Sequence, residues 1–312
     1  MNRLAFFLLP LTFAGLAACN SGGSSGGDTQ TPPTPPAAPL DTVSARIEAD
    51  GPVDFSTTAS VLRRNGRANT ARIASRQPVS FRFRKSATDD SVVLVTALGR
   101  EVKFDPDDLS TSGFEYGRRL RGGTRVYLFT FDGTWAQVEN GSSRFDHMVR
   151  VGVSDVVENI NTRTYGVFGV RTTAAQLPTS GSASYREIEG MRAEVYGSTD
   201  SANASYLIAD VAVDMDFATS QVSGNFSNLR FPSGGRLDLT LAIDPATVSN
   251  GAFQTTLTAV NGEPGQALAS SNVNGAFYGP KAEEVGGDFS FTSVATADSI
   301  PAVAAGVFGA RQ

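Results

Sequence analysis

Residues 272–294 read NVNGAFYGPKAEEVGGDFSFTSV, and this stretch decides the fold of the second half of the chain. Residues 272–278 and 288–294 are predicted to be two β-strands, and residues 279–287 form the loop between them. Pro280 has no N–H to give to a neighbouring strand, and the glycines on either side allow positive φ. The backbone must therefore turn here.

Further strands are predicted at short intervals around this stretch: 163–170, 191–197, 205–217, 221–229, 236–243, 252–260 and 306–311. In the clearest of them, 205–217, one face is apolar and the other carries Asp210, Asp214 and Asp216. A lipid-facing barrel would have an apolar outer face, so these aspartates exclude that class. The strand count and the alternation predict an all-β domain, a roughly eight-stranded soluble antiparallel β-barrel.

The inward positions of two of these strands are bulky and apolar. They are Leu207, Val211, Val213, Met215, Phe217, Leu237, Leu239, Leu241 and Ile243, with the small Ala209 among them. We expect the barrel to be filled by its own side chains, because an eight-stranded barrel is just wide enough for that or for one small ligand. A ligand would then bind at the loops or on the first half of the chain.

Two phrases in this half resemble a known family. The first has the pattern G-x-F-Y-G-P-x-A-x-E-x-G-G, formed by Gly275, Phe277, Tyr278, Gly279, Pro280, Ala282, Glu284, Gly286 and Gly287. The second is LPTSGSASY at residues 177–185, preceded by Gly169 and Thr172. Both resemble the barrels of the transferrin-binding protein B-like surface lipoproteins, although Arg186 stands near a position where the family commonly has glycine.

The resemblance implies one lobe of such a protein: a small antiparallel handle domain at residues 41–151, followed by the barrel at 152–312. It covers the barrel well and the handle only in general layout. Family members are displayed on the outer surface and bind proteins or haem-carrying ligands, so the resemblance implies an unidentified protein or solute partner. Transferrin itself is not implied, because only one lobe is present. The alternatives are a structural or adhesin-like envelope lipoprotein and a lipocalin-like carrier of a small molecule.

The first half also has the period of β-strands. Val79, Phe81 and Phe83 alternate with polar residues, and 91–97 is predicted to be a more buried strand. Residues 105–109 predict a short helical turn capped by Asp105. Residues 124–131 and 134–139 flank Asp-Gly, the dipeptide of a tight hairpin turn, and 145–153 supply a third strand. Trp135, on that hairpin, is expected in the core.

The N-terminus resembles a bacterial lipoprotein signal. Arg3 precedes an apolar run at residues 4–18, which is too short to span a bilayer and ends in Leu-Ala-Ala before Cys19. We expect a signal peptide at 1–18, a lipidated Cys19 and a Gly/Ser/Pro-rich tether at 19–40. The alternative is an ordinary secretory signal with a stray cysteine. Asn20 favours the outer membrane by the same resemblance, and we expect display at the cell surface.

The composition favours a binding protein over an enzyme. His147 is the only histidine, Cys19 the only cysteine, and no nucleophile or phosphate-binding motif occurs. We therefore expect no catalytic residue, no metal and no cofactor. The formal net charge of −5 offers no basic excess for nucleic acid. We expect a monomer.

The candidate partner contacts lie in two polar segments. They are Tyr116, Arg118, Arg119 and Arg121 before the predicted hairpin, and Lys281, Glu283 and Glu284 in the loop 279–287. Arginine and tyrosine are enriched at binding hot spots. The alternative is that both segments are merely solvated loops.

Overall fold

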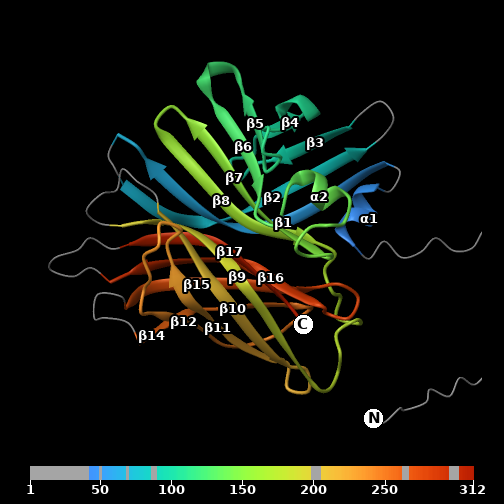
Figure 1. Cartoon of the computed structure of the whole chain (residues 1–312), viewed down its shortest axis with the longest axis vertical. Helices are drawn as coiled ribbons and strands as arrows, with labels where there is room; N and C mark the ends of the chain where they lie inside the picture. Colours follow the sequence, from blue (N-terminus) through green and yellow to red (C-terminus); the bar gives the residue numbers. More distant parts are fainter. Residues whose placement is uncertain are drawn as a thin grey trace, which may run out of the picture. The chain divides into compact units, whose positions relative to one another are not determined.

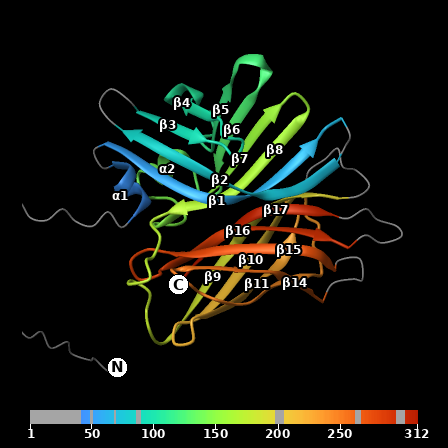
Figure 2. The same ribbon diagram turned by 180° about the vertical axis from the view of Figure 1, so that it is seen from behind.

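The structure, a computed structural model, describes residues 42–48, 51–67, 70–85, 90–197, 205–261, 267–294 and 302–312. These residues form two antiparallel β-sheets, one drawn in blue to yellow-green and the other in yellow to red (Figures 1 and 2). Within this part of the chain, no helix has the length and apolar character needed to cross a membrane. The predicted signal peptide, Cys19 and the tether lie outside the described residues.

The first sheet has eight strands in the order β4-β3-β2-β1-β8-β7-β6-β5. They are β1 (Gly51–Asn65), β2 (Thr70–Lys85), β3 (Asp90–Val95), β4 (Glu101–Phe104), β5 (Glu115–Arg119), β6 (Arg125–Thr130), β7 (Met148–Val157) and β8 (Ile160–Gly169). The two edge strands, β4 and β5, lie beside each other, so the sheet is nearly closed. As predicted, Val79, Phe81 and Phe83 of β2 are buried in its core.

The second sheet has nine strands in the order β13-β15-β16-β17-β9-β10-β11-β12-β14. They are β9 (Ser182–Tyr196), β10 (Ser205–Asp216), β11 (Gln221–Arg230), β12 (Thr240–Thr247), β13 (Ala252–Thr255), β14 (Leu257–Val260), β15 (Leu268–Tyr278), β16 (Glu284–Ser293) and β17 (Val303–Arg311). Because β13 also lies beside β12, and β14 beside β15, this sheet is nearly closed as well.

The chain thus contains two near-closed antiparallel barrels, and the prediction of a small handle plus one eight-stranded barrel is wrong in this respect. Both β7 and β8 belong to the first sheet, where β8 pairs with β1. The boundary placed after Val151 therefore falls inside β7. In the second sheet, the predicted strand 252–260 breaks at Thr256, because β13 pairs with β15 while β14 pairs with β12.

Short helical elements complete the first sheet: α1 (Val43–Glu48), η1 (Pro106–Asp108), η2 (Arg121–Gly123) and α2 (Trp135–Glu139). The helical turn with Pro106 in first position is confirmed. The hairpin predicted at the Asp-Gly pair is wrong, because residues 135–139 are helical. Thr134 caps this helix and exchanges hydrogen bonds with Gln137, a capping box that fixes a helix start. Trp135 is fully buried, as predicted.

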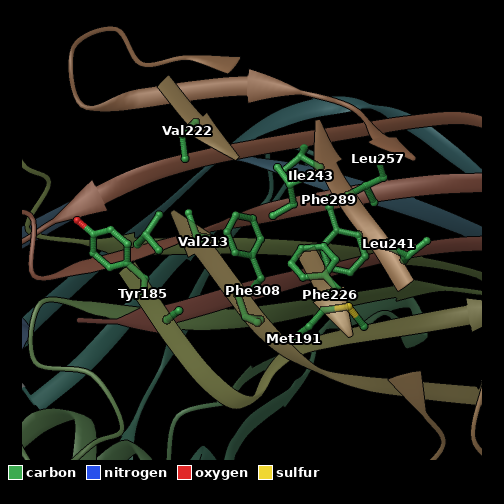
Figure 3. Packing of buried hydrophobic residues seen from close by; sticks show 14 of the residues in the cluster. Tyr185, Met191, Val213, Val222, Phe226, Leu241, Ile243, Leu257, Phe289 and Phe308 are labelled. Atoms are coloured by element: carbon green, nitrogen blue, oxygen red, sulfur yellow. The ribbon is translucent and has the colours of Figure 1, made fainter. Parts of the chain in front are cut away.

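The interior of the second sheet is packed with apolar side chains (Figure 3). The rings of Phe289 and Phe308 lie 5.1 and 5.4 Å from that of Phe226, between centroids. Residues predicted to point inward on β10 are buried, and so are Leu241 and Ile243 of β12. Leu237 and Leu239 are only half-buried, because β12 begins later than predicted, at Thr240.

The two sequence phrases that mark the second half meet at the turn between β15 and β16. The turn itself is short: Gly279 adopts a φ of 86°, and β16 already begins at Glu284. Thr172 donates a 2.6 Å hydrogen bond to the carbonyl of Gly279, and Tyr185 donates one of 2.7 Å to that of Ala282. Residues from both phrases therefore hold one turn in place.

The glycines at the end of this stretch lie in a strand and not in the predicted loop. Gly287 of β16 pairs with Gly275 of β15. A Cβ on Gly287 would lie 2.0 Å from the backbone oxygen of Asn274, so only glycine fits there. These glycines serve close approach of backbone and side chains, while Gly279 supplies the turn.

Candidate functional site

The candidate contacts before β6 are only partly at the surface. Tyr116 is buried, and its ring centroid lies 5.7 Å from that of Phe104 and 5.6 Å from that of Trp135. Arg118 is half-buried and donates hydrogen bonds of 3.1 Å to the carboxylates of Asp105 and Asp108. Tyr116 thus supports the core, and Arg118 ties β5 to η1. The last two residues of this set, Arg119 and Arg121, are exposed, and their role as contacts stays a prediction.

The candidate contacts in the turn after β15 differ from one another. Lys281 is exposed, and Glu283 is half-buried and accepts a 2.8 Å hydrogen bond from the Lys281 N–H. Glu284 is buried, so the prediction that it lies in a solvated loop is wrong. Its carboxylate accepts hydrogen bonds from the backbone N–H groups of Asp146 (2.7 Å) and His147 (3.1 Å). Burial raises the pKa of Glu284 to about 7.

Glu284 is one of three buried carboxylates that the second sheet directs at the first. A second is Asp288, also on β16, which accepts a 2.6 Å hydrogen bond from the Ser60 hydroxyl. The same carboxylate receives two hydrogen bonds from the Arg76 guanidinium, at 2.5 and 3.1 Å. Burial raises the pKa of Asp288, and the hydrogen bond from Arg76 opposes that shift. One carboxylate of β16 thus joins β1 and β2.

The third carboxylate is Glu194 of β9. It accepts hydrogen bonds from the phenols of Tyr165 and Tyr196, the latter at 2.5 Å, and pairs with Arg163 at 3.4 Å. Burial and the neighbouring charge of Glu194 raise the pKa of Tyr165 well above its usual value, so the phenol stays protonated and donates a hydrogen bond to the carboxylate. Because Tyr165 and Arg163 belong to β8, this cluster also crosses between the sheets.

One buried cation of the first sheet also bonds the second sheet. Arg150 of β7 is fully buried and pairs with Asp132 at 2.6 Å. Its guanidinium also donates a hydrogen bond to the carbonyl of Gly190 in the second sheet. An apolar cluster that includes Leu62, Met148 and Val307 fills the space between these polar links. The two sheets therefore share a packed and hydrogen-bonded junction, and concave surfaces that both sheets line are preformed.

One such surface is a groove of about 650 Å³, which we call the aromatic groove. It is lined by Ser110, Ser112, Phe114, Glu115, Phe129, Thr130, Phe131, Arg163, Arg192, Tyr206, Leu207 and Pro232. Phe114 is 47% exposed and Tyr206 48% exposed. Among the large apolar side chains that the described part of the chain exposes, these two are the aromatic ones, and both lie in this groove.

The charges of the aromatic groove come mainly from two arginines. Arg163 stands 5.8 Å from the centre of the Phe129 ring, a cation–π distance. The pKa of Arg192 is lowered, first by burial and then by the nearby Arg150 charge. Arg192 already pairs with the carboxylate of Glu189 at 3.3 Å, and Arg163 with that of Glu194. The groove therefore offers aromatic surface and arginine donors, the chemistry enriched at protein-binding hot spots.

A second concavity, the polar pocket, has a volume of about 500 Å³ and is lined by both sheets. Its polar walls include Thr57, Thr58, Arg76, Arg171, Thr247, Ser249, Gln254, Asn274 and Asp288. Among the described residues, no group of three or more histidine, cysteine, aspartate or glutamate side chains is arranged to hold a metal. His147 precedes β7 and packs over Gly279.

Sequence reasoning did not single out the residues that shape these surfaces. Asp288 lies between Gly287 and Phe289 in a strand with an apolar alternation, and this was an available signal, whereas Glu194 lies in a strand with four other charged residues and had none. Phe114 and Tyr206 carried no signal, since they lie 92 positions apart and meet only through the packing of the two sheets.

Residues 177–312 match the family of the C-lobe and N-lobe beta barrels of Tf-binding protein B. All nine strands of the second sheet lie in this range, so that sheet is a barrel domain of the Tf-binding protein B type. This family is a family of binding proteins. No curated protein sequence matches the chain.

Several solved structures are similar to the chain. One is a mutant of transferrin-binding protein B from Haemophilus parasuis, which is 19% identical with a TM-score of 0.44. The match covers 83% of this chain and 44% of the transferrin-binding protein. The isotype 1 protein from serogroup B Neisseria meningitidis is 20% identical with a TM-score of 0.42, covering 82% and 43%. A surface lipoprotein is 14% identical with a TM-score of 0.34, covering 83% and 98%. The chain spans less than half the length of the two transferrin-binding proteins.

Proposed function

We propose that the chain is a lipid-anchored, cell-surface lipoprotein of the outer membrane that binds a protein ligand through the aromatic groove. The observation that carries this proposal is the pair of exposed aromatic side chains, Phe114 and Tyr206, in one groove of a protein whose second sheet belongs to the Tf-binding protein B barrels. Large exposed aromatic side chains that gather in one place mark interaction sites in soluble proteins.

The proposal includes a division of the chain into segments, beginning with a membrane anchor at the N-terminus. A signal peptide at residues 1–18, lipidation at Cys19 and a tether at 19–40 would attach the folded part to the membrane at a distance. We place the boundary between the two barrels in the connection between Gly169 and Ser182, where the first sheet ends and the second begins.

The packing of the second barrel favours a surface ligand over a carried one. Phe226, Phe289 and Phe308 occupy its centre, and its inward strand positions carry apolar side chains in contact with them. A lipocalin-like carrier would need a roomy interior for its cargo. A purely structural envelope protein, in turn, has no need to expose two aromatic rings in one groove.

The groove can be tested by site-specific photo-crosslinking on intact cells. A benzophenone amino acid at position 206 should crosslink a partner protein from the surrounding fluid, and the double variant Phe114→Ala/Tyr206→Ala should lower binding at least about tenfold. Position 160 is the matched control, because Ile160 is also exposed but lies outside the groove. Equal crosslinking at both positions, or none at 206, would favour the structural alternative.

The anchor needs its own experiment. Cys19→Ala should release the protein from membranes, as followed by detergent-phase partitioning and by mass spectrometry of the mature N-terminus. Protease added to whole cells should cut within residues 21–39 and shed the folded part. Shedding that requires permeabilised outer membranes would place the protein on the periplasmic side and remove support for an external partner.

A further inference from the structure

We propose that the polar pocket is a second binding site, and that it takes a small hydroxylated carboxylate of the sugar-acid class. This inference is independent of the aromatic groove, because the two concavities share no lining residue. A volume of about 500 Å³ is within the range of small-molecule sites.

The floor of the polar pocket is preorganised. Asp288 is 3% exposed and is held by Ser60, by both hydrogen bonds of Arg76 and, at 3.4 Å, by the Asn274 amide. Arg76 also donates to the carbonyl of Thr58. The charges of Asp288 and Arg76 cancel, so the floor presents fixed polar groups without net charge.

Part of the floor is the backbone of glycines, where an added Cβ would meet Met148 or the backbone oxygen of Asn274. Gly286 and Gly287 line the pocket beside Asp288. Gly275, opposite Gly287, is covered by the ring of Phe253, which would lie 2.1 Å from a Cβ at that position. Phe253 is therefore fixed against the backbone and forms an apolar wall. Small-molecule pockets are usually lined mainly by apolar side chains, whereas the lining of this pocket is mainly polar, which suits a polar ligand.

The positive charge of the pocket comes from Arg171, which follows β8 and is exposed. It hydrogen-bonds Tyr278, which lowers the pKa of that buried phenol, while burial has the larger effect and raises the pKa to about 12. Among the ion pairs between described residues, none joins Arg171 to a carboxylate. A bound carboxylate would supply that partner, and arginine suits it because its fork can donate two parallel hydrogen bonds.

The remaining walls select for hydroxyl groups. The side chains of Thr58, Thr247, Ser249 and Gln254 line the pocket and are exposed to it or to solvent. Hydroxyl and amide groups can both donate and accept, which matches the mixed hydrogen bonding of sugar hydroxyls. An apolar ligand would leave these groups unpaired on burial, at a cost in free energy. A ligand that suits the pocket therefore carries a carboxylate, which binds Arg171, and several hydroxyl groups, which bind these polar side chains. Sugar acids have both.

The test is a calorimetric titration of the purified full chain, in detergent micelles, with glucuronate. Glucose serves as the uncharged probe and acetate as the carboxylate without ring hydroxyls. We expect saturable binding of glucuronate, with glucose and acetate each at least about tenfold weaker. Arg171→Gln should weaken glucuronate at least about tenfold and leave glucose unchanged, and Arg171→Lys should lie between.

Arg125→Gln is the matched control, since Arg125 is an exposed arginine outside the pocket, and it should bind as the unchanged chain does. Thermal unfolding of each variant confirms that it is folded. No saturable binding of glucuronate would overturn the proposal, as would equal binding of glucose or an Arg171→Gln variant that binds normally. Loss of this site would leave crosslinking at position 206 intact, so the two proposals fail separately.

Discussion

The hydroxyl of Ser60 donates a 2.6 Å hydrogen bond to Oδ2 of Asp288, and this bond joins residues 228 positions apart in the chain. Ser60 lies on β1 of the first sheet and Asp288 on β16 of the second. Both side chains are buried, so the bond is shielded from water. With the Arg76 pair on the same carboxylate, it makes Asp288 one of the buried polar groups that join the two sheets.

Asp288→Ala should therefore destabilise the protein by about 3 kcal/mol, because it leaves the partly buried Arg76 charge and the Ser60 hydroxyl without their partner. Asp214→Ala is the matched control. Asp214 also pairs with an arginine, Arg186, at 2.8 Å, but both side chains are more than half exposed, and its loss should cost less than about 1 kcal/mol. Urea unfolding of both variants measures the difference. Equal losses would show that the junction does not rely on Asp288.

Stability should fall as pH rises through neutrality because of Glu284. The folded pKa of about 7 lies above the usual 4.5, so the folded state holds a proton that the unfolded state releases between these values. The stabilisation is complete below pH 4.5 and is lost as pH rises through 7, amounting to at most about 3 kcal/mol. Asp288, whose pKa is also raised, adds a change of the same sign.

Glu284→Gln isolates this effect, since the amide keeps one acceptor for the Asp146 and His147 N–H groups but does not titrate in this range. The difference in unfolding free energy between the unchanged chain and the variant should shrink or reverse between pH 4.5 and 7. Glu283→Gln, at the half-buried neighbour, is the control. A difference that stays constant over this range would contradict the assignment to Glu284.

Gly287→Ala should destabilise the second barrel by about 3 kcal/mol or more. The added Cβ would lie 2.0 Å from the Asn274 oxygen and 2.8 Å from the Gly275 Cα, and backbone atoms cannot move aside as a flexible side chain could. Gly197→Ala is the control, because its Cβ would meet nothing closer than 3.9 Å, and its effect should stay within about 1 kcal/mol. Thermal unfolding distinguishes the two. If Gly287→Ala lowered the stability only slightly, β15 and β16 would separate more easily than their pairing indicates.

The sequence correctly predicted which strand residues are buried wherever this depends on the alternation of apolar and polar residues. The alternation in β2 and β10 placed Val79, Phe81, Val211 and Val213 in the cores correctly. At Thr134 two local signals competed, and the capping box with Gln137 outweighed the Asp-Gly turn signal. Trp135 at the start of this helix also packs in the core of the first sheet, a tertiary contact that periodicity does not report.

The candidate site was harder to predict, because it arises between the sheets. Glu284 was visible in its sequence phrase, but its role depends on the backbone of Asp146 and His147, far earlier in the chain. Phe114 and Tyr206 become neighbours of one groove only after both barrels pack. Contacts of this kind follow from tertiary structure and leave no trace in spacing or composition.

The interior of the second barrel supplies the last prediction. Leu241 is fully buried in the cluster that contains Phe226 and Phe289, whereas Leu239 lies just before β12 and is half-buried. An aspartate at position 241 would bury an unpaired charge among these rings, which costs several kcal/mol, so Leu241→Asp should unfold the domain. Leu239→Asp should stay folded with a smaller loss, because its carboxylate can reach water. Circular dichroism and urea unfolding of the full chain measure both. A Leu241→Asp variant as stable as the unchanged chain would mean that water reaches the barrel interior, and would favour the carrier function over binding at the surface.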